Sequence, residues 1–418
     1  MAIKHTVAMG TIATLMMSGA ALAGGHASCG PEGQSVRVLG SDFPAIQAVT
    51  AAAEASCSGA ASEFVVNLRD DTRDMMNQAL TPNPAQFSSV IVANATLTQL
   101  MNDGLVRPLD DLVAQYGLEL NPSQFITLDG QIMAVAFMAN SQHLYARTDI
   151  LEEAGISEIP STLDEIVAAA EAIRAAGIME HPIVMNATGW NLGELFNLFY
   201  FGHDGQLFEA GSAEPAINNE TGVAALEAMA ALAEYAHPDY LSHASNETQA
   251  LWEAGQAALG IMWGSRGGAV LDDEGSSPEV TENTVLTGAP TVTEGGTPVA
   301  TLWWDGVTIA TNISDEEAEA AFAALVGALN ADMVAENTDD AIWLIDGYMP
   351  GPAASGVTET VQHGARPNPM LHYINLMHNA AGAEVADFLQ GEESAEETLA
   401  DIEAAYRTAA IEAGFLQE

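Results

Sequence analysis

The first third of the chain alternates short apolar runs with stretches of helix-forming residues, and this alternation restricts the possible folds more than any other feature. The apolar runs lie at residues 35–39, 64–68 and 89–93, and the helical stretches follow them at 45–55, 75–80 and 94–102. Parallel strands require a crossover between them, usually a helix. Three strand–helix units in succession therefore predict an α/β fold whose parallel sheet is covered by helices on both faces.

Polar residues follow each of the three predicted strands. Ser41 and Asp42 follow the first, Asp70 and Asp71 the second, and Asn94 the third. In sheets of this kind ligands bind beyond the carboxyl ends of the strands. These side chains are therefore expected to share one rim of the sheet.

The pattern continues through the rest of the chain. Further strands are predicted at residues 132–137, 183–186, 257–262 and 307–311, and helices at 148–154, 192–201 and 222–233. Thr162 with Glu165, and Ser314 with Glu317, have the spacing of capping boxes, which predicts that a helix begins after each. Residues 276–298 are rich in Gly, Thr, Pro and Glu and are predicted to form a surface connection. The last 40 residues are predicted to be mostly helical, with a final helix beginning near residue 392.

The charge balance excludes several classes of protein. The chain has 57 Asp and Glu but only 10 Lys and Arg, for a formal charge of −47, and its one lysine is Lys4. Such a surface repels nucleic acids and anionic membranes. A P-loop ATPase, a kinase or a Schiff-base enzyme needs a working lysine in its folded domain. We therefore expect no nucleic-acid partner and none of these activities.

The N-terminus resembles an export signal. Lys4 supplies the basic segment, residues 7–17 form a short apolar core, and Ala21-Leu22-Ala23 is a typical cleavage site. We predict that residues 1–23 are a signal peptide and that the mature protein is periplasmic. The alternatives are a buried N-terminal helix, or a lipoprotein anchored at Cys29.

Two cysteines, Cys29 and Cys57, fit an oxidising compartment, and we expect them to form a disulfide. Cys29 precedes the first strand, and Cys57 lies between the first helix and the second strand. Both therefore fall at the amino-terminal edge of the sheet, far from the predicted ligand rim. The alternative is a pair of free buried thiols.

Motifs for metal or catalytic chemistry are absent. The ten His are scattered, and the sequence has neither an H-E-x-x-H motif nor paired cysteines. It also lacks the G-x-S-x-G elbow of serine hydrolases. We therefore expect no metal and no cofactor. A pair of acids for glycoside hydrolysis remains possible, because chance pairs are unavoidable among 57 carboxylates.

The six tryptophans divide into two groups. Trp252 and Trp343 sit among apolar residues and are expected in the core, whereas Trp190, Trp263, Trp303 and Trp304 sit beside Gly, Asn or Asp near the ends of elements. An aromatic ring beside polar groups suits sugar recognition, because it can cover the apolar face of a pyranose. The alternative is that each ring is buried at an internal contact.

Five segments, taken in chain order, resemble motifs of the family 1 extracellular solute-binding proteins, which are sugar receptors of ABC importers. They are residues 106–111 (VRPLDD), 129–137 (DGQIMAVAF), 145–165, 252–259 (WEAGQAAL) and 305–310 (DGVTIA). The ordered set covers nearly the whole mature chain.

The sequence departs from the family motifs at a few positions. Leu163 stands where the family has Trp, Ala136 where it has Pro, and the lysine positions hold Gln or Arg. These positions affect packing and surface, so the expected fold is unchanged. They do weaken any inference about a particular sugar.

The resemblance implies a two-lobed periplasmic binding protein fold, in which each lobe is a mostly parallel sheet flanked by helices and a hinge joins the lobes. It places residues 24–137 and 305–338 in the N-terminal lobe, and residues 138–304 and 339–418 in the C-terminal lobe. It also implies that the protein is a monomer that traps a sugar between its lobes and delivers it to the permease of an ABC transporter. No bond is made or broken in this function.

Topology and resemblance together predict the ligand-binding residues, which come from both lobes and from the crossings between them: Asp42, Asn94, Asn140, Trp190, Glu194, Trp263, Arg266, Trp304, Asp305, Arg366 and Tyr373. Trp263 is the strongest candidate, because it ends a strand and Gly264 follows it, which lets a ligand approach the backbone closely.

Two other functions fit the same sequence. One keeps the receptor fold but binds a polyamine or another small cation, since acidic walls with aromatic faces suit an amine. The other is a secreted carbohydrate hydrolase, which needs a pair of carboxylates in the cleft.

Overall fold

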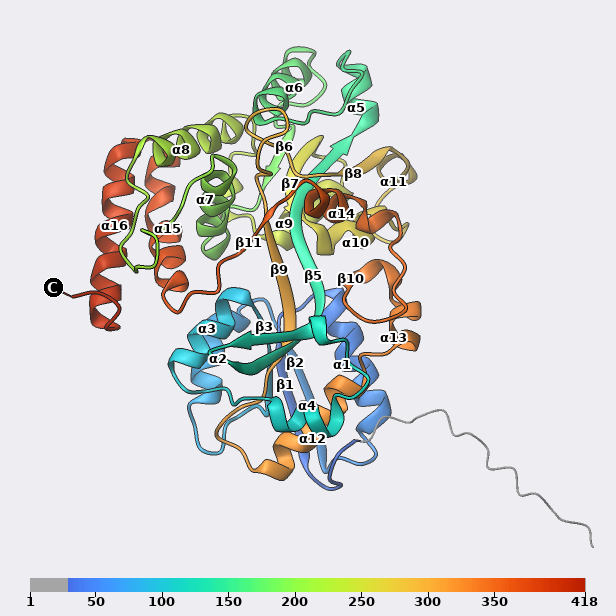
Figure 1. Cartoon of the computed structure of the whole chain (residues 1–418). Coiled ribbons are helices and arrows are strands. Elements are labelled where there is room, and N and C mark those ends of the chain that lie inside the picture. The colour runs from blue at the N-terminus through green and yellow to red at the C-terminus, as the bar shows by residue number, and fades with distance from the viewer. Residues whose placement is uncertain (1–28, 418) are drawn as a thin grey trace, which may run out of the picture.

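The computed structural model describes residues 29–417, which fold into two lobes placed one above the other (Figure 1). Two strands, β5 (Gln131–Arg147) and β9 (Thr301–Val307), run from one lobe into the other and pair antiparallel along their crossing. The predicted signal peptide, residues 1–23, lies outside the described residues. None of the described helices is long and apolar enough to cross a membrane.

The first lobe is built from the three predicted strand–helix units. Strands β1 (Ser35–Gly40), β2 (Glu63–Leu68) and β3 (Ser89–Ala93) are parallel, in the order β2-β1-β3, and are followed by helices α1 (Pro44–Cys57), α2 (Thr72–Leu80) and α3 (Asn94–Asn102). The prediction of a parallel sheet with crossover helices is therefore confirmed in this part. The other elements of the lobe are α4 (Asp110–Tyr116), β4 (Phe125–Leu128), α12 (Asp315–Gly327) and α13 (Ala331–Glu336).

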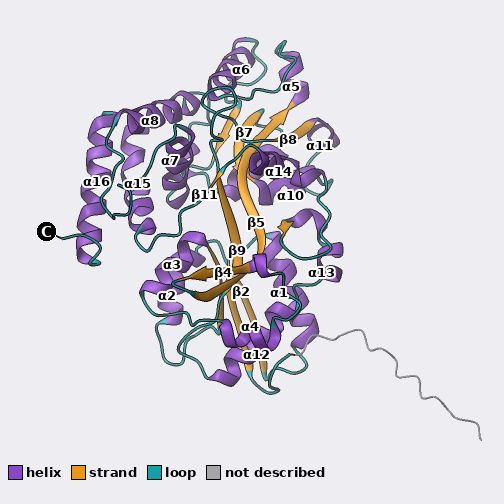
Figure 2. Ribbon diagram, viewed as in Figure 1, coloured by secondary structure: helices purple, strands orange, loops and turns teal. Residues whose placement is uncertain are grey.

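The second lobe has a smaller sheet and more helices, as Figure 2 shows. Its central pair, β6 (Ile183–Met185) and β7 (Leu259–Trp263), is parallel, and both β7 and β8 (Thr284–Thr287) pair antiparallel with β5. The helices are α5 (Thr148–Glu153), α6 (Leu163–Ala175), α7 (Trp190–Gly202), α8 (Glu220–Ala233), α9 (Ser245–Glu253), α10 (Gly267–Leu271), α11 (Pro278–Asn283), α14 (Ser355–Gln362), α15 (Ile374–Leu389) and α16 (Ala395–Glu412). Two short strands, β10 (Ile342–Trp343) and β11 (Arg366–Pro367), pair with β5 and β9.

Four predictions about this architecture need correction. The strand predicted at 132–137 extends to Arg147, because one continuous strand serves both lobes. The strand predicted at 307–311 lies earlier, at Thr301–Val307, and residues 276–298 contain α11 and β8 as well as loops. The joined sheet is mixed, since β5 and β9 run antiparallel to their neighbours.

The core of the first lobe has two halves, one on each face of its sheet. Neighbouring residues of β1 show this, since Val38 packs with Ile46 and Phe322 on one face and Leu39 packs with Leu97 on the other. Successive residues of a strand point to opposite faces, so an apolar run covered on both faces produces this arrangement. The Trp343 ring, 3% exposed, joins the first of these clusters.

Local sequence signals set several helix boundaries as predicted. The Thr162 hydroxyl accepts a hydrogen bond from the Glu165 N–H, and the Glu165 carboxylate accepts one from the Thr162 N–H. The Ser314 hydroxyl caps α12 by accepting from the Glu317 N–H. These bonds satisfy N–H groups that have no partner within the helix.

The predicted disulfide between Cys29 and Cys57 is present, with the two Cα atoms 5.5 Å apart. Cys57 is the last residue of α1, a helix of 14 residues that runs about 20 Å back along the sheet from the carboxyl end of β1. The disulfide therefore ties the chain at the edge of the sheet opposite the rim that follows β1, β2 and β3.

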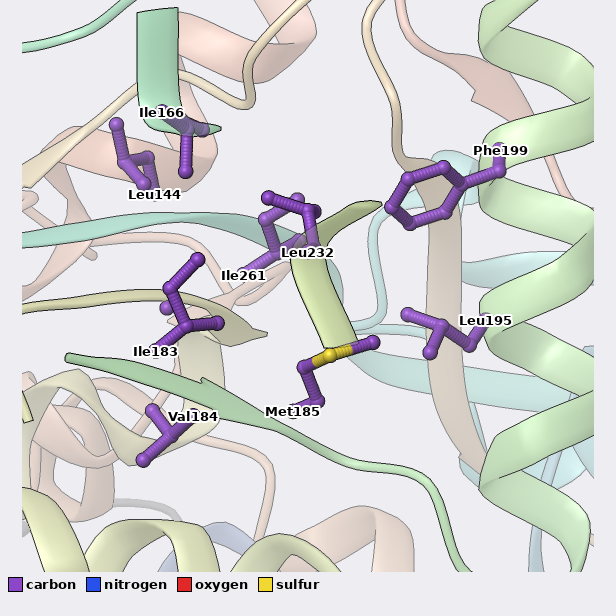
Figure 3. A pocket seen from close by; sticks show the side chains of 10 residues that line it. Leu144, Ile166, Ile183, Val184, Met185, Leu195, Phe199, Leu232 and Ile261 are labelled. Atoms are coloured by element: carbon purple, nitrogen blue, oxygen red, sulfur yellow. The ribbon is translucent and has the colours of Figure 1, made fainter. Parts of the chain in front are cut away.

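A small apolar void lies within the core of the second lobe (Figure 3). Its walls are side chains of β5, β6, β7, α6, α7 and α8, among them Leu144, Ile183, Met185, Phe199 and Ile261. Its volume is about 10 Å³. A water molecule needs at least about that space together with polar partners, so this void is a packing gap of the core.

Candidate functional site

A larger cavity, of about 260 Å³, lies between the two lobes. Its lining residues come from the first lobe, from the second lobe and from the two crossing strands: Ser41, Asp42, Phe43, Asp70, Arg73, Ala93, Asn140, Asn191, Ala244, Ser245, Asn246, Glu247, Trp263, Ser265, Arg266, Trp303 and Asp305. Most of these side chains are polar, and two are tryptophans.

The first lobe contributes the predicted rim. Asp42 follows β1, Asp70 follows β2 and Ala93 ends β3, so the carboxyl ends of three parallel strands meet at the cavity. The Asp42 carboxylate accepts a hydrogen bond from Gln47 Nε2 at 2.7 Å. Arg73, in the first turn of α2, completes this side of the cavity.

The second lobe contributes the end of β7 and the turn that follows it. Trp263 is the last residue of β7, and Ser265 and Arg266 lie in the next turn. Asn140 of β5 holds this turn, because its Nδ2 donates to Ser265 Oγ at 3.2 Å and its Oδ1 accepts from the Ser265 N–H at 3.1 Å. The crossing strand therefore positions Arg266 at the cavity.

Four aromatic rings form a continuous cluster beside the cavity. Trp303 meets Trp263 and Trp190 edge to face, with centroid distances of 5.7 Å and 5.4 Å. The Trp190 ring is stacked between the His378 ring, at 4.2 Å, and the Arg73 guanidinium, at 3.8 Å from its centroid. Edge-to-face and cation–π contacts of this kind hold the rings in fixed orientations.

Glu194 lies behind this cluster, 3% exposed, and does not reach the cavity. Its Oε1 accepts hydrogen bonds from Thr301 Oγ1 at 2.6 Å, from Trp303 Nε1 at 3.1 Å and from Gln142 Nε2 at 3.1 Å. Burial raises the pKa of Glu194 to about 7, because the charged carboxylate is removed from water. The carboxylate orients Trp303 from behind.

His378 is neutral in the same buried layer. Its Nε2 lies 2.7 Å from the Trp190 carbonyl oxygen, so this nitrogen carries the proton, and its Nδ1 accepts from Asn197 Nδ2 at 3.3 Å. Burial lowers the pKa of His378 to about 3. The ring therefore acts as a flat surface beneath Trp190.

Asp305 is the crossing-strand carboxylate that faces the cavity. Burial raises its pKa to about 7, and the positive charge of Arg73 opposes this rise. Burial also lowers the guanidinium pKa values of Arg73 and Arg266, and both side chains are half-buried, whereas Asp42 and Asp70 of the same cavity are exposed. Charged groups in such a site interact more strongly than they do in water.

The alternation of side chains along β9 corrects one predicted site residue. Trp303 and Asp305 point to the cavity, whereas Trp304 points to the opposite face and packs in the first-lobe core with Leu39 and Val92. Adjacent residues of a strand cannot share a face, so Trp304 and Asp305 could not both line the cavity.

Three further predicted residues lie away from the cavity. The Asn94 side chain is buried, where its Oδ1 accepts from the Trp304 N–H and its Nδ2 donates to the Leu302 carbonyl, which ties α3 to β9. Arg366 pairs with Asp204 at 2.7 Å, and the Tyr373 hydroxyl donates to the Ser212 carbonyl. Of the eleven predicted residues, Asp42, Asn140, Trp263, Arg266 and Asp305 line the cavity, while Trp190 and Glu194 lie directly behind it.

The two lobes touch around the cavity. Asn246 at the start of α9 donates to Asp70 at 3.2 Å, and Arg73 of the first lobe covers Trp190 of the second. Farther out, Asn375 Nδ2 donates to the Ala95 carbonyl at 2.7 Å. These contacts describe a closed arrangement of the lobes.

Sequence analysis missed several residues at the cavity. Arg73 is the most important, and its position just after the β2 rim, among Asp70 and Asp71, could have indicated it. Trp303 could have been predicted in place of Trp304, because residues two apart in a strand point to the same face and Trp303 is two residues from Asp305. Nothing local marked Asn191 or Asn246, because the second-lobe helices that carry them are brought to the cavity only by tertiary packing.

No metal site is evident at the cavity. Within residues 29–417, no three His, Cys, Asp or Glu side chains gather closely enough to hold a metal ion. The chemistry of the cavity is that of hydrogen-bonding groups, four carboxylates, two guanidiniums and three aromatic rings.

The fold and this site define a class, the two-lobed α/β proteins that hold a small solute between their lobes. Residues 81–332 match the family model described as bacterial extracellular solute-binding protein, and the chain belongs to that family. This confirms the resemblance found in the sequence. A search of curated proteins finds no significant match.

Solved structures with the same fold have low sequence identity. T. maritima MalE3 with maltose bound has a TM-score of 0.78 at 19% identity, covering 90% of this chain and 99% of its own. A solute-binding protein from Agrobacterium radiobacter in complex with ribitol also has a TM-score of 0.78 at 19% identity, covering 91% and 100%. A sugar transporter protein from Arthrobacter chlorophenolicus with bound laminaribiose has a TM-score of 0.73 at 14% identity, covering 90% and 99%. These likenesses establish the two-lobed fold.

Proposed function

We propose that this protein is the substrate-binding component of a carbohydrate ABC importer, which holds a sugar between its lobes and delivers it to permease subunits. The observation that carries this proposal is the cavity itself, where Trp263 and Trp303 stand beside a ring of polar side chains. Aromatic rings cover the apolar faces of sugars, and the polar groups bond the hydroxyls. The three structural relatives hold maltose, ribitol and laminaribiose, which supports the same class of ligand.

The proposed lobes follow the predicted boundaries with one refinement. The first comprises residues 24–137 and 305–338, and the second comprises 138–304 and 339–418. Because Trp343 and Ile345 pack in the first-lobe core, we add residues 341–345 to the first lobe. The hinge then lies where β5 and β9 cross, next to Asn140 and Asp305.

The proposed ligand contacts are the predicted residues that line the cavity, together with Arg73 and Trp303. Trp190 and Glu194 are proposed to act behind them, by orienting Arg73 and Trp303. The protein is proposed to be a periplasmic monomer that carries out no reaction on its ligand. The form with its lobes closed around the sugar is the one that a transporter would recognise.

Isothermal titration calorimetry against a panel of mono- and disaccharides tests the proposal. Saturable binding of at least one sugar, with the sugar recovered unchanged by chromatography, is the expected result. Sugar hydrolysis would show the rival enzyme function. Binding of spermidine or putrescine, with no binding of any sugar, would show the rival cation receptor, whose support is the carboxylates of Asp42, Asp70 and Glu247 at the cavity.

A further inference from the structure

The arginines of this chain are distributed in a way that singles out the cavity. Of the 10 Lys and Arg, one is Lys4, which leaves nine arginines. Seven of them form an ion pair with a carboxylate: Arg37, Arg69, Arg107, Arg147, Arg174, Arg366 and Arg407. Within residues 29–417 the remaining two, Arg73 and Arg266, have no carboxylate oxygen within 4.0 Å, and both line the cavity.

This separation is unexpected for so acidic a chain. The chain has 57 Asp and Glu, so carboxylates are abundant, and seven of the nine arginines form an ion pair with one of them. Four carboxylates even line the same cavity as the two unpaired guanidiniums. An arginine that remains unpaired under these conditions is held away from its neighbours by the fold.

The contacts of Arg73 and Arg266 show how they are held. The Arg73 guanidinium lies flat on the Trp190 ring, at 3.8 Å, and no hydrogen bond from it is found to any described residue. Arg266 uses one N–H, from Nη1, to bond Gln249 Oε1 at 3.1 Å. A guanidinium presents a planar fork of N–H donors, so both side chains have donors left for a ligand.

The cavity carboxylates are occupied in other ways. Asp42 accepts from Gln47, Asp70 accepts from Asn246, and Glu247 accepts from the Ala244 N–H at 2.9 Å. Asp305, whose pKa burial raises to about 7, carries only part of its charge at neutral pH. The cationic donors of the cavity that have no carboxylate partner are the guanidiniums of Arg73 and Arg266, and a ligand that binds them must supply acceptor oxygens.

Building on the proposed sugar-binding function, we propose that the ligand is an acidic sugar of the uronate or aldonate class, whose carboxylate binds the guanidinium of Arg73 or that of Arg266. A planar carboxylate matches the guanidinium fork and can accept two parallel hydrogen bonds. A carboxylate carries one negative charge, and a phosphate would bring nearly two toward Asp42, Asp70 and Glu247. The single charge therefore fits the cavity better.

Calorimetry with matched pairs of sugars tests this assignment. The probes are D-galacturonate, D-glucuronate and D-gluconate, uronate disaccharides, the neutral counterpart of each, and galactose 6-phosphate. At least one carboxylate sugar is expected to bind at least about tenfold more tightly than its neutral counterpart and than the phosphate. At least one of the variants Arg73→Gln and Arg266→Gln should reduce the acid-over-neutral affinity ratio about tenfold or more.

Arg407→Gln is the matched control, because it removes the same charge from α16, where Arg407 pairs with Glu214 far from the cavity. It should leave the affinity ratio unchanged, and circular dichroism confirms that each variant is folded. If neutral sugars bind as well as acids, or the phosphate binds best, this inference fails while the sugar-binding function stands. If no sugar binds, both fail. An acid preference that survives both cavity substitutions refutes the assignment to these arginines.

Discussion

The variant Glu194→Gln tests whether the buried carboxylate behind the cavity has a raised pKa and lowers the stability of the protein when it ionises. The carboxylate is 3% exposed, and burial raises its pKa from its ordinary value of 4.5 to about 7. In the unfolded chain the group titrates near its ordinary value, so the folded state binds more protons between pH 4.5 and 7. The contribution of this group to the free energy of unfolding is therefore largest below pH 4.5, and it is lost as the pH rises toward 7.

The size of the effect follows from the two pKa values. Each unit of difference corresponds to about 1.4 kcal/mol, so the ionised carboxylate costs about 3 kcal/mol at pH 8. Glutamine keeps the acceptor oxygen for Thr301, Trp303 and Gln142 but cannot ionise. The variant should match the wild type near pH 5 and be more stable by up to about 3 kcal/mol at pH 8.

Urea unfolding followed by far-UV circular dichroism at pH 5, 6.5 and 8 measures this difference. Glu282→Gln, which removes the same charge from an exposed position on α11, controls for the change in net charge and should show no such pH dependence. If Glu194→Gln destabilises the protein equally at pH 5 and pH 8, the buried carboxylate is not held near neutrality, and the reasoning is wrong.

Three further predictions concern the cavity and the disulfide. Trp263→Ala should weaken sugar binding in calorimetry at least about thirtyfold, because a buried aromatic contact contributes about 2 kcal/mol. The melting temperature of the unliganded protein should change little, and a large drop would show that the ring stabilises the core and does not serve the ligand. Because the pKa of Asp305 is raised to about 7, this residue gains charge between pH 6 and 8, so the affinity for an acidic sugar should fall over that range in the wild type and stay flat in Asp305→Asn; parallel profiles would contradict this. Reducing the Cys29–Cys57 disulfide, which spans 28 residues, should lower the free energy of unfolding by about 3 kcal/mol in urea titrations. The ligand preference should not change, and a changed preference would contradict our conclusion that the disulfide is remote from the cavity.

Much of the fold was predictable because its signals are local. The strands at 35–39, 64–68 and 89–93 are rich in Val and other apolar residues, and their crossover helices follow directly, so the parallel part of the sheet could be inferred from the sequence. Thr162 and Glu165 form the predicted capping box, whereas Ser314 accepts from the Glu317 N–H but the Glu317 carboxylate pairs with Arg37 and does not return to the Ser314 N–H. Strand β5 was predicted too short, because no local signal reveals that a strand continues from one lobe into the next.

The sequence by itself determined many of the strands and helices and several of the residues at their ends, since alternation and capping are properties of neighbouring residues. This was sufficient to place Asp42 and Trp263 at the cavity. Tertiary structure alone decided which face of β9 points into the cavity. It also decided that the Asn94 side chain bonds the backbone of β9, and that the Arg73 guanidinium lies on the Trp190 ring of the other lobe. These outcomes depend on contacts between residues more than 100 positions apart, and such contacts exist only in the folded chain.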